Sequence, residues 1–126
     1  MSFQVLKADN SQHIVLGWGS VSVLDGELVT DLQGDQIEPE ELEKAVFEFM
    51  SNSRESGMMH EGQPIGHVVA SLVTTPDVVK AFGLSEDLPV GWILGVKVTD
   101  DAVWAKVVSG ELSAFSIQGR SGQEAV

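Results

Sequence analysis

Two residues of this chain could together perform acyl-transfer chemistry: a serine near the C-terminal end and a histidine in the middle. Ser116 stands in the apolar run AFSIQGR, and His60 stands in MMHEG. A serine hydroxyl becomes a nucleophile when a base takes its proton and nearby donors stabilise the oxyanion. The backbone amides around Gly119 and Arg120 are available as such donors. Taken singly, either residue is more often structural, so the pair needs elements that bring its members together.

The run around Ser116 has the alternation of a strand with one buried face. We predict a strand over residues 112–118, in which Phe115 and Ile117 face the core. Ser116 then lies on the opposite face, which can be open. His60 follows an apolar pair, and we predict that it lies at the end of a loop leading into a strand.

The other two histidines give weaker signals. His67 lies inside an apolar strand run and His13 near the start of another, so both are interpreted as structural. His60 and His67 are seven residues apart with Pro64 between them, whereas the two histidines of a helical zinc motif are four residues apart. The chain has no cysteine, which excludes disulfides and zinc–thiolate sites. We therefore expect neither a metal nor a cofactor.

The elements that must position these side chains alternate along the chain. Pro39 opens a helix predicted over residues 39–53, because apolar residues recur there at helical spacing and acidic ones crowd the first turn. Thr99 is predicted to cap a later helix that stops at Gly110. The remaining predictions are strands over 12–24, 65–73 and 90–98, a turn at Asp25-Gly26, and a short helix over 76–83.

This order leaves two architectures open. A doubly wound parallel sheet fits the alternation of strands and helices, but no glycine-rich phosphate loop joins a strand to a helix. Gly17 and Gly19 flank Trp18 and predict a bend or bulge, as small barrels use at corners. A small barrel with helices packed around it fits equally well. No linker or repeat appears, so residues 1–126 are predicted to form a single domain.

Charge and composition exclude several classes of function. The chain has 126 residues, a net charge of −12, and 7 basic against 19 acidic residues. The basic residues are scattered, which disfavours nucleic-acid binding and an anionic membrane surface. No signal peptide is recognisable, and no apolar run reaches the roughly 18 residues of a membrane helix. We expect a soluble intracellular protein whose acidity serves solubility or a basic partner.

Several blocks, in this order, resemble one known family. They are GWGSVSV, DLQGDQIEPEELEKAVFEFM, GMMHEGQPIGHVVAS and PVGWILGVKVTDDAVWAKVVSGELSAFSIQGR, spanning about residues 12–120. The chain resembles the XkdF-like phage serine proteases, within the wider group of phage prohead proteases and herpesvirus assemblins.

The resemblance implies an α+β, β-rich fold, a small and mostly antiparallel β-barrel flanked by helices. It implies hydrolysis of peptide bonds by a serine and a histidine on neighbouring barrel strands, and these match Ser116 and His60. The implied function is a prohead (capsid) maturation endopeptidase that cleaves scaffold or capsid protein, without a cofactor. It would act in the host bacterial cytoplasm inside the assembling prohead, and a homo-oligomer is plausible.

Two features depart from the family pattern. Gln118 stands where family members commonly have glycine, and its side chain could narrow the site. The chain ends ten residues after Ser116, whereas related enzymes carry a third catalytic residue on a later strand. Glu124 is the only acid after the serine. The third member could instead be Glu61 or Asp35, the chain could be a trimmed piece, or the site could be a dyad.

Two further readings stay open. One is a catalytically inactive scaffold-like or capsid-assembly module of the same fold, which a missing third residue favours. The other is a barrel that binds a small molecule or peptide outside phage assembly. The presence of both His60 and Ser116 favours the enzyme, because a purely structural module needs neither.

Overall fold

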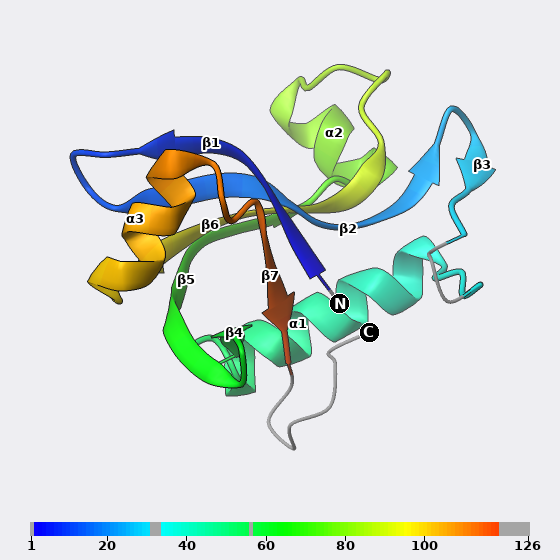
Figure 1. Cartoon of the computed structure of the whole chain (residues 1–126). Coiled ribbons are helices and arrows are strands. Elements are labelled where there is room, and N and C mark those ends of the chain that lie inside the picture. The colour runs from blue at the N-terminus through cyan, green and yellow to red at the C-terminus, as the bar shows by residue number, and fades with distance from the viewer. Residues whose placement is uncertain (1, 31–33, 56, 119–126) are drawn as a thin grey trace.

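The computed structural model describes residues 2–30, 34–55 and 57–118, which form a β-barrel with helices packed around it (Figure 1). Within these ranges the strands are β1 (Ser2–Asp9), β2 (Ile14–Leu24), β3 (Glu27–Leu28), β4 (Met58–His60), β5 (Gln63–Val73), β6 (Val90–Val98) and β7 (Ala114–Ile117). The helices are α1 (Pro39–Asn52), α2 (Pro76–Phe82) and α3 (Asp101–Ser109).

Six strands close the barrel, because the sheet runs in the order β1-β7-β4-β5-β6-β2 and β1 also pairs with β2. The pairings between these strands are antiparallel. β3 extends β2 as a short hairpin beside the ring. The β-rich α+β barrel is therefore confirmed, and the doubly wound parallel sheet is wrong for this chain.

Irregularities in the strand register let the sheet curve into a ring. The β2–β6 pairing shifts between Trp18 and Ser20, at the bend that the sequence predicts. β1 and β5 carry similar shifts. Extra residues of this kind increase the local twist of a strand and bend it. Gly19 is required here for packing as well, since a Cβ atom would lie 2.6 Å from the ring of Trp92.

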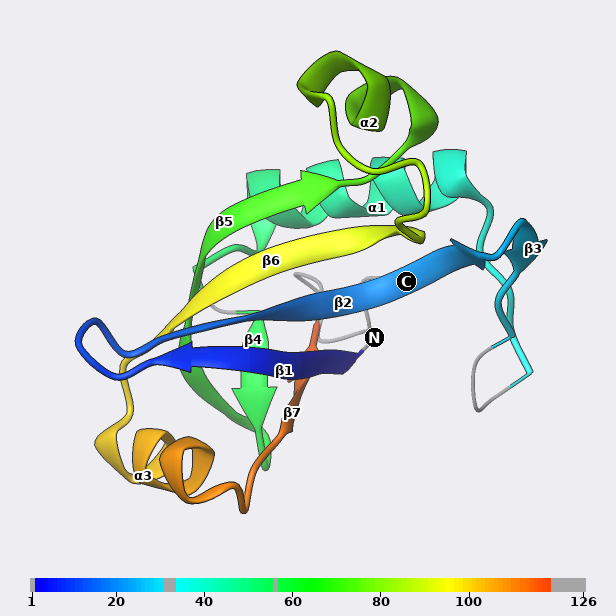
Figure 2. The ribbon, with the colours of Figure 1, turned by 90° about the horizontal axis from the view of Figure 1, so that it is seen from above.

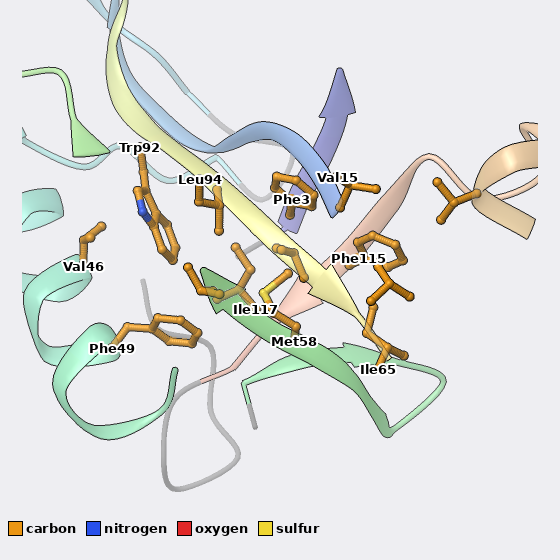
Figure 3. Close-up of a cluster of buried hydrophobic side chains, with 14 of the residues drawn as sticks. Phe3, Val15, Val46, Phe49, Met58, Ile65, Trp92, Leu94, Phe115 and Ile117 are labelled. Atoms are coloured by element: carbon orange, nitrogen blue, oxygen red, sulfur yellow. The ribbon is translucent and has the colours of Figure 1, made fainter. Parts of the chain in front are cut away.

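Helix α1 follows the sequence prediction closely and runs along one side of the sheet, beside β5 and β6 (Figure 2). It begins at Pro39, with Glu38 as N-cap in a reciprocal capping box. Its buried residues are Leu42, Val46 and Phe49. The ring of Phe49 meets that of Trp92 edge-on with centroids 5.4 Å apart, and this contact joins α1 to β6 (Figure 3).

Helix α3 leads into β7, and its start differs from the prediction. Asp100, not Thr99, is the N-cap, because the Asp100 side chain accepts a hydrogen bond from the Val103 amide at 3.0 Å. The Thr99 hydroxyl bonds the carbonyl of Ile65 instead. The Trp104 ring of α3 stacks on His13 with centroids 4.5 Å apart, which fixes the helix to the β1–β2 loop.

The core is continuous from the barrel interior to α1 and α3. Figure 3 shows side chains of β1, β4, β5, β6 and β7 converging on one another beside α1. Among the helices of the described ranges, none has the length and apolarity needed to cross a membrane.

Candidate active site

Strand β7 presents Ser116 as the sequence predicts. Phe115 is 3% exposed and Ile117 is 0% exposed, whereas Ser116 between them is exposed. Phe115 also stacks on Phe3 of β1 with ring centroids 6.0 Å apart. The strand is therefore held from its core side, and the serine lies on its outer face.

Strand β4 carries His60 and pairs directly with β7. The sequence predicted a loop here, because glycines and a proline surround the segment. The structure has a tight hairpin, in which His60 pairs with Gln63 across a two-residue turn. The implied arrangement, a serine and a histidine on neighbouring barrel strands, is present.

The base of this hairpin is packed tightly against α1 and β7. The Gln118 amide donates to the Gly57 carbonyl at 2.8 Å, which extends the β4–β7 pairing by one residue. A Cβ atom on Gly57 would lie 2.3 Å from the Phe49 ring. The Arg54 guanidinium donates to the Val68 carbonyl of β5 at 3.1 Å. Gly57 is needed for close packing, a role that the sequence alone did not predict.

The register between the two strands decides which side chain faces the serine. Ser116 lies directly opposite Met59, and Ile117 lies opposite Met58. Directly opposite residues share a face of the sheet, whereas consecutive residues alternate. In this register Met59 is thus the neighbour of Ser116, and His60 follows one residue beyond, at the end of β4. Within the described ranges, no hydrogen bond joins His60 to Ser116.

His60 is partly buried and has one charged neighbour. Its side chain is 23% exposed, and its Nε2 atom lies 3.9 Å from Oε1 of Glu61, whose side chain is 79% exposed. At this distance the contact is ionic in character and too long for a hydrogen bond.

The other predicted site groups lie elsewhere. Gly119, Arg120 and Glu124 fall outside the described residues. His13 stacks on Trp104, and His67 pairs across to Lys97 on β6, so both serve the barrel. In the part of the chain that the structure describes, no three His, Cys, Asp or Glu side chains are grouped to hold a metal ion.

Comparison with known proteins places the sequence in a family. Residues 3–124 match the family described as "Putative phage serine protease XkdF". The chain is 30% identical over 92 residues to "Phage-like element PBSX protein XkdF" of Bacillus subtilis (strain 168). It is 32% identical over 92 residues to "Uncharacterized protein YqbD" of the same organism. No solved structure matches the chain.

These matches cover most of this chain but a minor part of each relative. The XkdF match covers 72% of this chain and 32% of that protein, and the YqbD match covers 71% and 27%. The chain thus corresponds to about a third or less of each relative.

Proposed function

Because the chain belongs to the XkdF family of phage serine proteases, we propose that it is a serine endopeptidase with Ser116 as nucleophile and His60 as general base. The observation that carries the proposal is the pairing of β4 with β7, which brings the two residues onto adjacent strands. Ser116 is also exposed on the outer face of the barrel, where an extended peptide can reach it.

The chemistry is acyl transfer in two halves. The Ser116 hydroxyl gives its proton to His60 as its oxygen bonds to the scissile carbonyl carbon. His60 then protonates the leaving amine as the carbon–nitrogen bond breaks. In the second half, water gives a proton to His60 and attacks the ester carbon. The ester bond breaks, and the proton returns to the Ser116 oxygen.

The base must come closer to the serine than the register of the free protein allows. Since Met59 lies opposite Ser116, the end of β4 has to twist for His60 to reach the hydroxyl, while the buried Met58 keeps its place in the core. β4 is short, with three residues, and the β4–β5 register shifts between Met58 and Met59. Such an irregularity re-aims side chains at low cost. We place this movement at substrate binding.

The substrate we propose is phage scaffold or capsid protein, cleaved inside the assembling prohead in the host bacterial cytoplasm. One relative is named as part of a phage-like element, which agrees with this setting. The net charge of −12 suits a basic substrate segment. Self-association into a homo-oligomer belongs to the same proposal.

The deciding experiment is labelling with a fluorophosphonate probe, mapped by mass spectrometry. We expect the adduct on Ser116, its disappearance in Ser116→Ala, and a strong reduction in His60→Ala. Ser113→Ala is the matched control, since Ser113 is an exposed serine just before β7 whose carbonyl, rather than its side chain, bonds Val5. It should label like the parent protein.

A catalytically inactive assembly module is the second candidate, and one observation favours it: Met59, not His60, lies opposite Ser116. The same experiment separates the two. If Ser116 stays unlabelled when a scaffold protein is present, the chain is a module and the endopeptidase proposal is wrong.

A further inference from the structure

The turn after His60 has a backbone that ordinary residues rarely adopt. Glu61 has φ 52° and Gly62 has φ 76°, and the two form the whole loop between β4 and β5. Two-residue hairpin loops with both φ values positive favour asparagine, aspartate or glycine at the first position. Glutamate is an unfavourable choice there, so the backbone does not account for it.

The same turn occurs a second time in the molecule and shows the expected residue. Between β2 and β3, Asp25 has φ 52° and Gly26 has φ 80°, again as a two-residue loop. No heavy atom would come within 4 Å of a Cβ on Gly26 or on Gly62. Both turns are therefore open at this glycine, and packing there does not explain why one uses aspartate and the other glutamate.

The side chain of Glu61 contacts the candidate base. Its carboxylate lies 3.9 Å from Nε2 of His60. We propose that Glu61 is the positioning residue of the site, which orients the His60 ring and stabilises the imidazolium. This inference rests on the proposed function. Strained backbone that persists beside a candidate catalytic residue is a recognised sign of such a role.

The proton route follows from the contact. Because Glu61 lies on the Nε2 side, Nδ1 is the ring nitrogen that takes the proton of Ser116 and returns it to the leaving amine. Glu61 stays a carboxylate throughout and transfers no proton. It offsets the positive charge that the ring carries between the two transfers.

Two other acids of the described residues, Asp35 and Glu55, fit this role less well. Asp35 precedes α1, whereas β4 follows its far end, and 14 helical residues span about 21 Å. Glu55 lies before β4, and its carboxylate is 3.5 Å from Arg54. Of these three acids, Glu61 is the one whose contact with His60 the structure describes.

The test compares rates of fluorophosphonate labelling of Ser116 in the parent and in three variants. Glu61→Gln and Glu61→Asn should slow labelling about twofold to fivefold, because the exposed pair acts through a solvent-screened charge. Glu61→Asp, which keeps the charge, should recover most of the rate. Asp25→Asn is the matched control in the twin turn and should leave the rate unchanged.

Two further readouts separate a positioning role from a structural one. Glu61→Asn suits the turn better, so its urea midpoint should rise while its labelling slows. The labelling rate of the parent divided by that of Glu61→Gln should also approach one as the salt concentration rises. The reason is that the Debye length falls from about 30 Å at 0.01 M to about 3 Å at 1 M. Equal rates for the parent, Gln and Asn variants would overturn the role of Glu61 and leave the endopeptidase standing. A parent that never labels at Ser116 would overturn both.

Discussion

The two tight hairpins of this protein use one backbone for two purposes. Both have a two-residue turn with matching φ values, at Asp25-Gly26 and at Glu61-Gly62. The residue before the turn is Leu24 in the first hairpin and His60 in the second. The first hairpin therefore has residues that suit its conformation, whereas the second carries a titratable side chain and an acid at the same positions.

Helix α1 and the residues that lead into it contact both hairpins through different chemistry. Near its start, the buried Ser22 hydroxyl of the first hairpin donates to the Ile37 carbonyl at 2.6 Å. Near its end, Phe49 packs against Gly57 at the base of the second. The second hairpin is thus held by a close steric contact at Gly57, whereas the first is held by a hydrogen bond from Ser22.

The largest effect is expected for the residue before each turn. His60→Ala should lower the rate of peptide cleavage by about a hundredfold to ten-thousandfold, the usual contribution of a general base. Leu24→Ala changes the corresponding residue of the first hairpin, which is 49% exposed, and should leave the rate unchanged. Equal rates in the two variants, measured on one peptide substrate, would contradict the functional difference between the hairpins.

The register of β4 can be tested within the same comparison. In a variant that combines His60→Ala with Met59→His, the imidazole lies directly opposite Ser116 in the register of the free protein. Since the movement serves only to bring an imidazole to the serine, this variant should recover much of the rate lost in His60→Ala. A variant as slow as His60→Ala would show that an imidazole opposite Ser116 in this register is not sufficient for catalysis.

The next largest effect concerns the ends of the two hairpins that lie away from their turns. Gly57→Ala should destabilise the protein by about 1–3 kcal/mol, because the new methyl group overlaps the Phe49 ring. Ser22→Ala should cost about 1 kcal/mol, since it removes one hydrogen bond and leaves a carbonyl unpaired. The free energies of unfolding come from urea titration. A larger loss for Ser22→Ala would mean that the first hairpin is the more tightly fixed one.

The turns themselves should respond alike. Gly26→Ala and Gly62→Ala both place a side chain at a positive φ value, and each should cost about 1–2 kcal/mol. Neither alanine would meet a neighbouring atom, so conformational strain is the sole cause. Urea midpoints of the two variants should therefore agree. A clear difference between them would show that the turns are not equivalent.

The sequence predicted long, regular elements well and the second hairpin poorly. The helix expected over residues 39–53 and the strand over 90–98 appear at nearly the same bounds, because their apolar periodicity matches their burial. β4 was expected as part of a loop, in a segment where Gly62, Pro64 and Gly66 exclude a helix. Gly62 stands in a turn and Gly57 is needed for packing, and residue type alone does not distinguish these two roles.

The sequence and the resemblance supplied the candidate residues, and neither predicted their register. Alternation around Ser116 identified the exposed face of β7 correctly, and the resemblance supplied His60. Which residue of β4 lies opposite the serine depends on how Gly57 packs against Phe49 and Gln118. That contact joins segments far apart in the chain, so no local pattern reveals it. β1 was also missed, because its register shift between Val5 and Lys7 interrupts the alternation.

The smallest expected effect concerns the pKa of Asp9, an acid in a loop for which no catalytic role is proposed. Hydrogen bonds from the Ser11 hydroxyl, and then from the Gln12 side chain, lower the pKa of Asp9 to about 2 from its ordinary 3.8. A lowered pKa in the folded state adds stability at pH values above the pKa of the unfolded chain, and this stability is lost as pH falls from about 4 toward 2.

Ser11→Ala should move the titration midpoint of Asp9, followed by carboxyl carbon NMR, back toward 3.8. Ser109→Ala, in a serine that bonds Lys106 instead, should leave it in place. An unchanged midpoint in Ser11→Ala would show that the hydrogen bond from Ser11 does not lower the pKa of Asp9. Asp9 would then no longer serve as the structural comparison for Glu61, whose carboxylate faces His60.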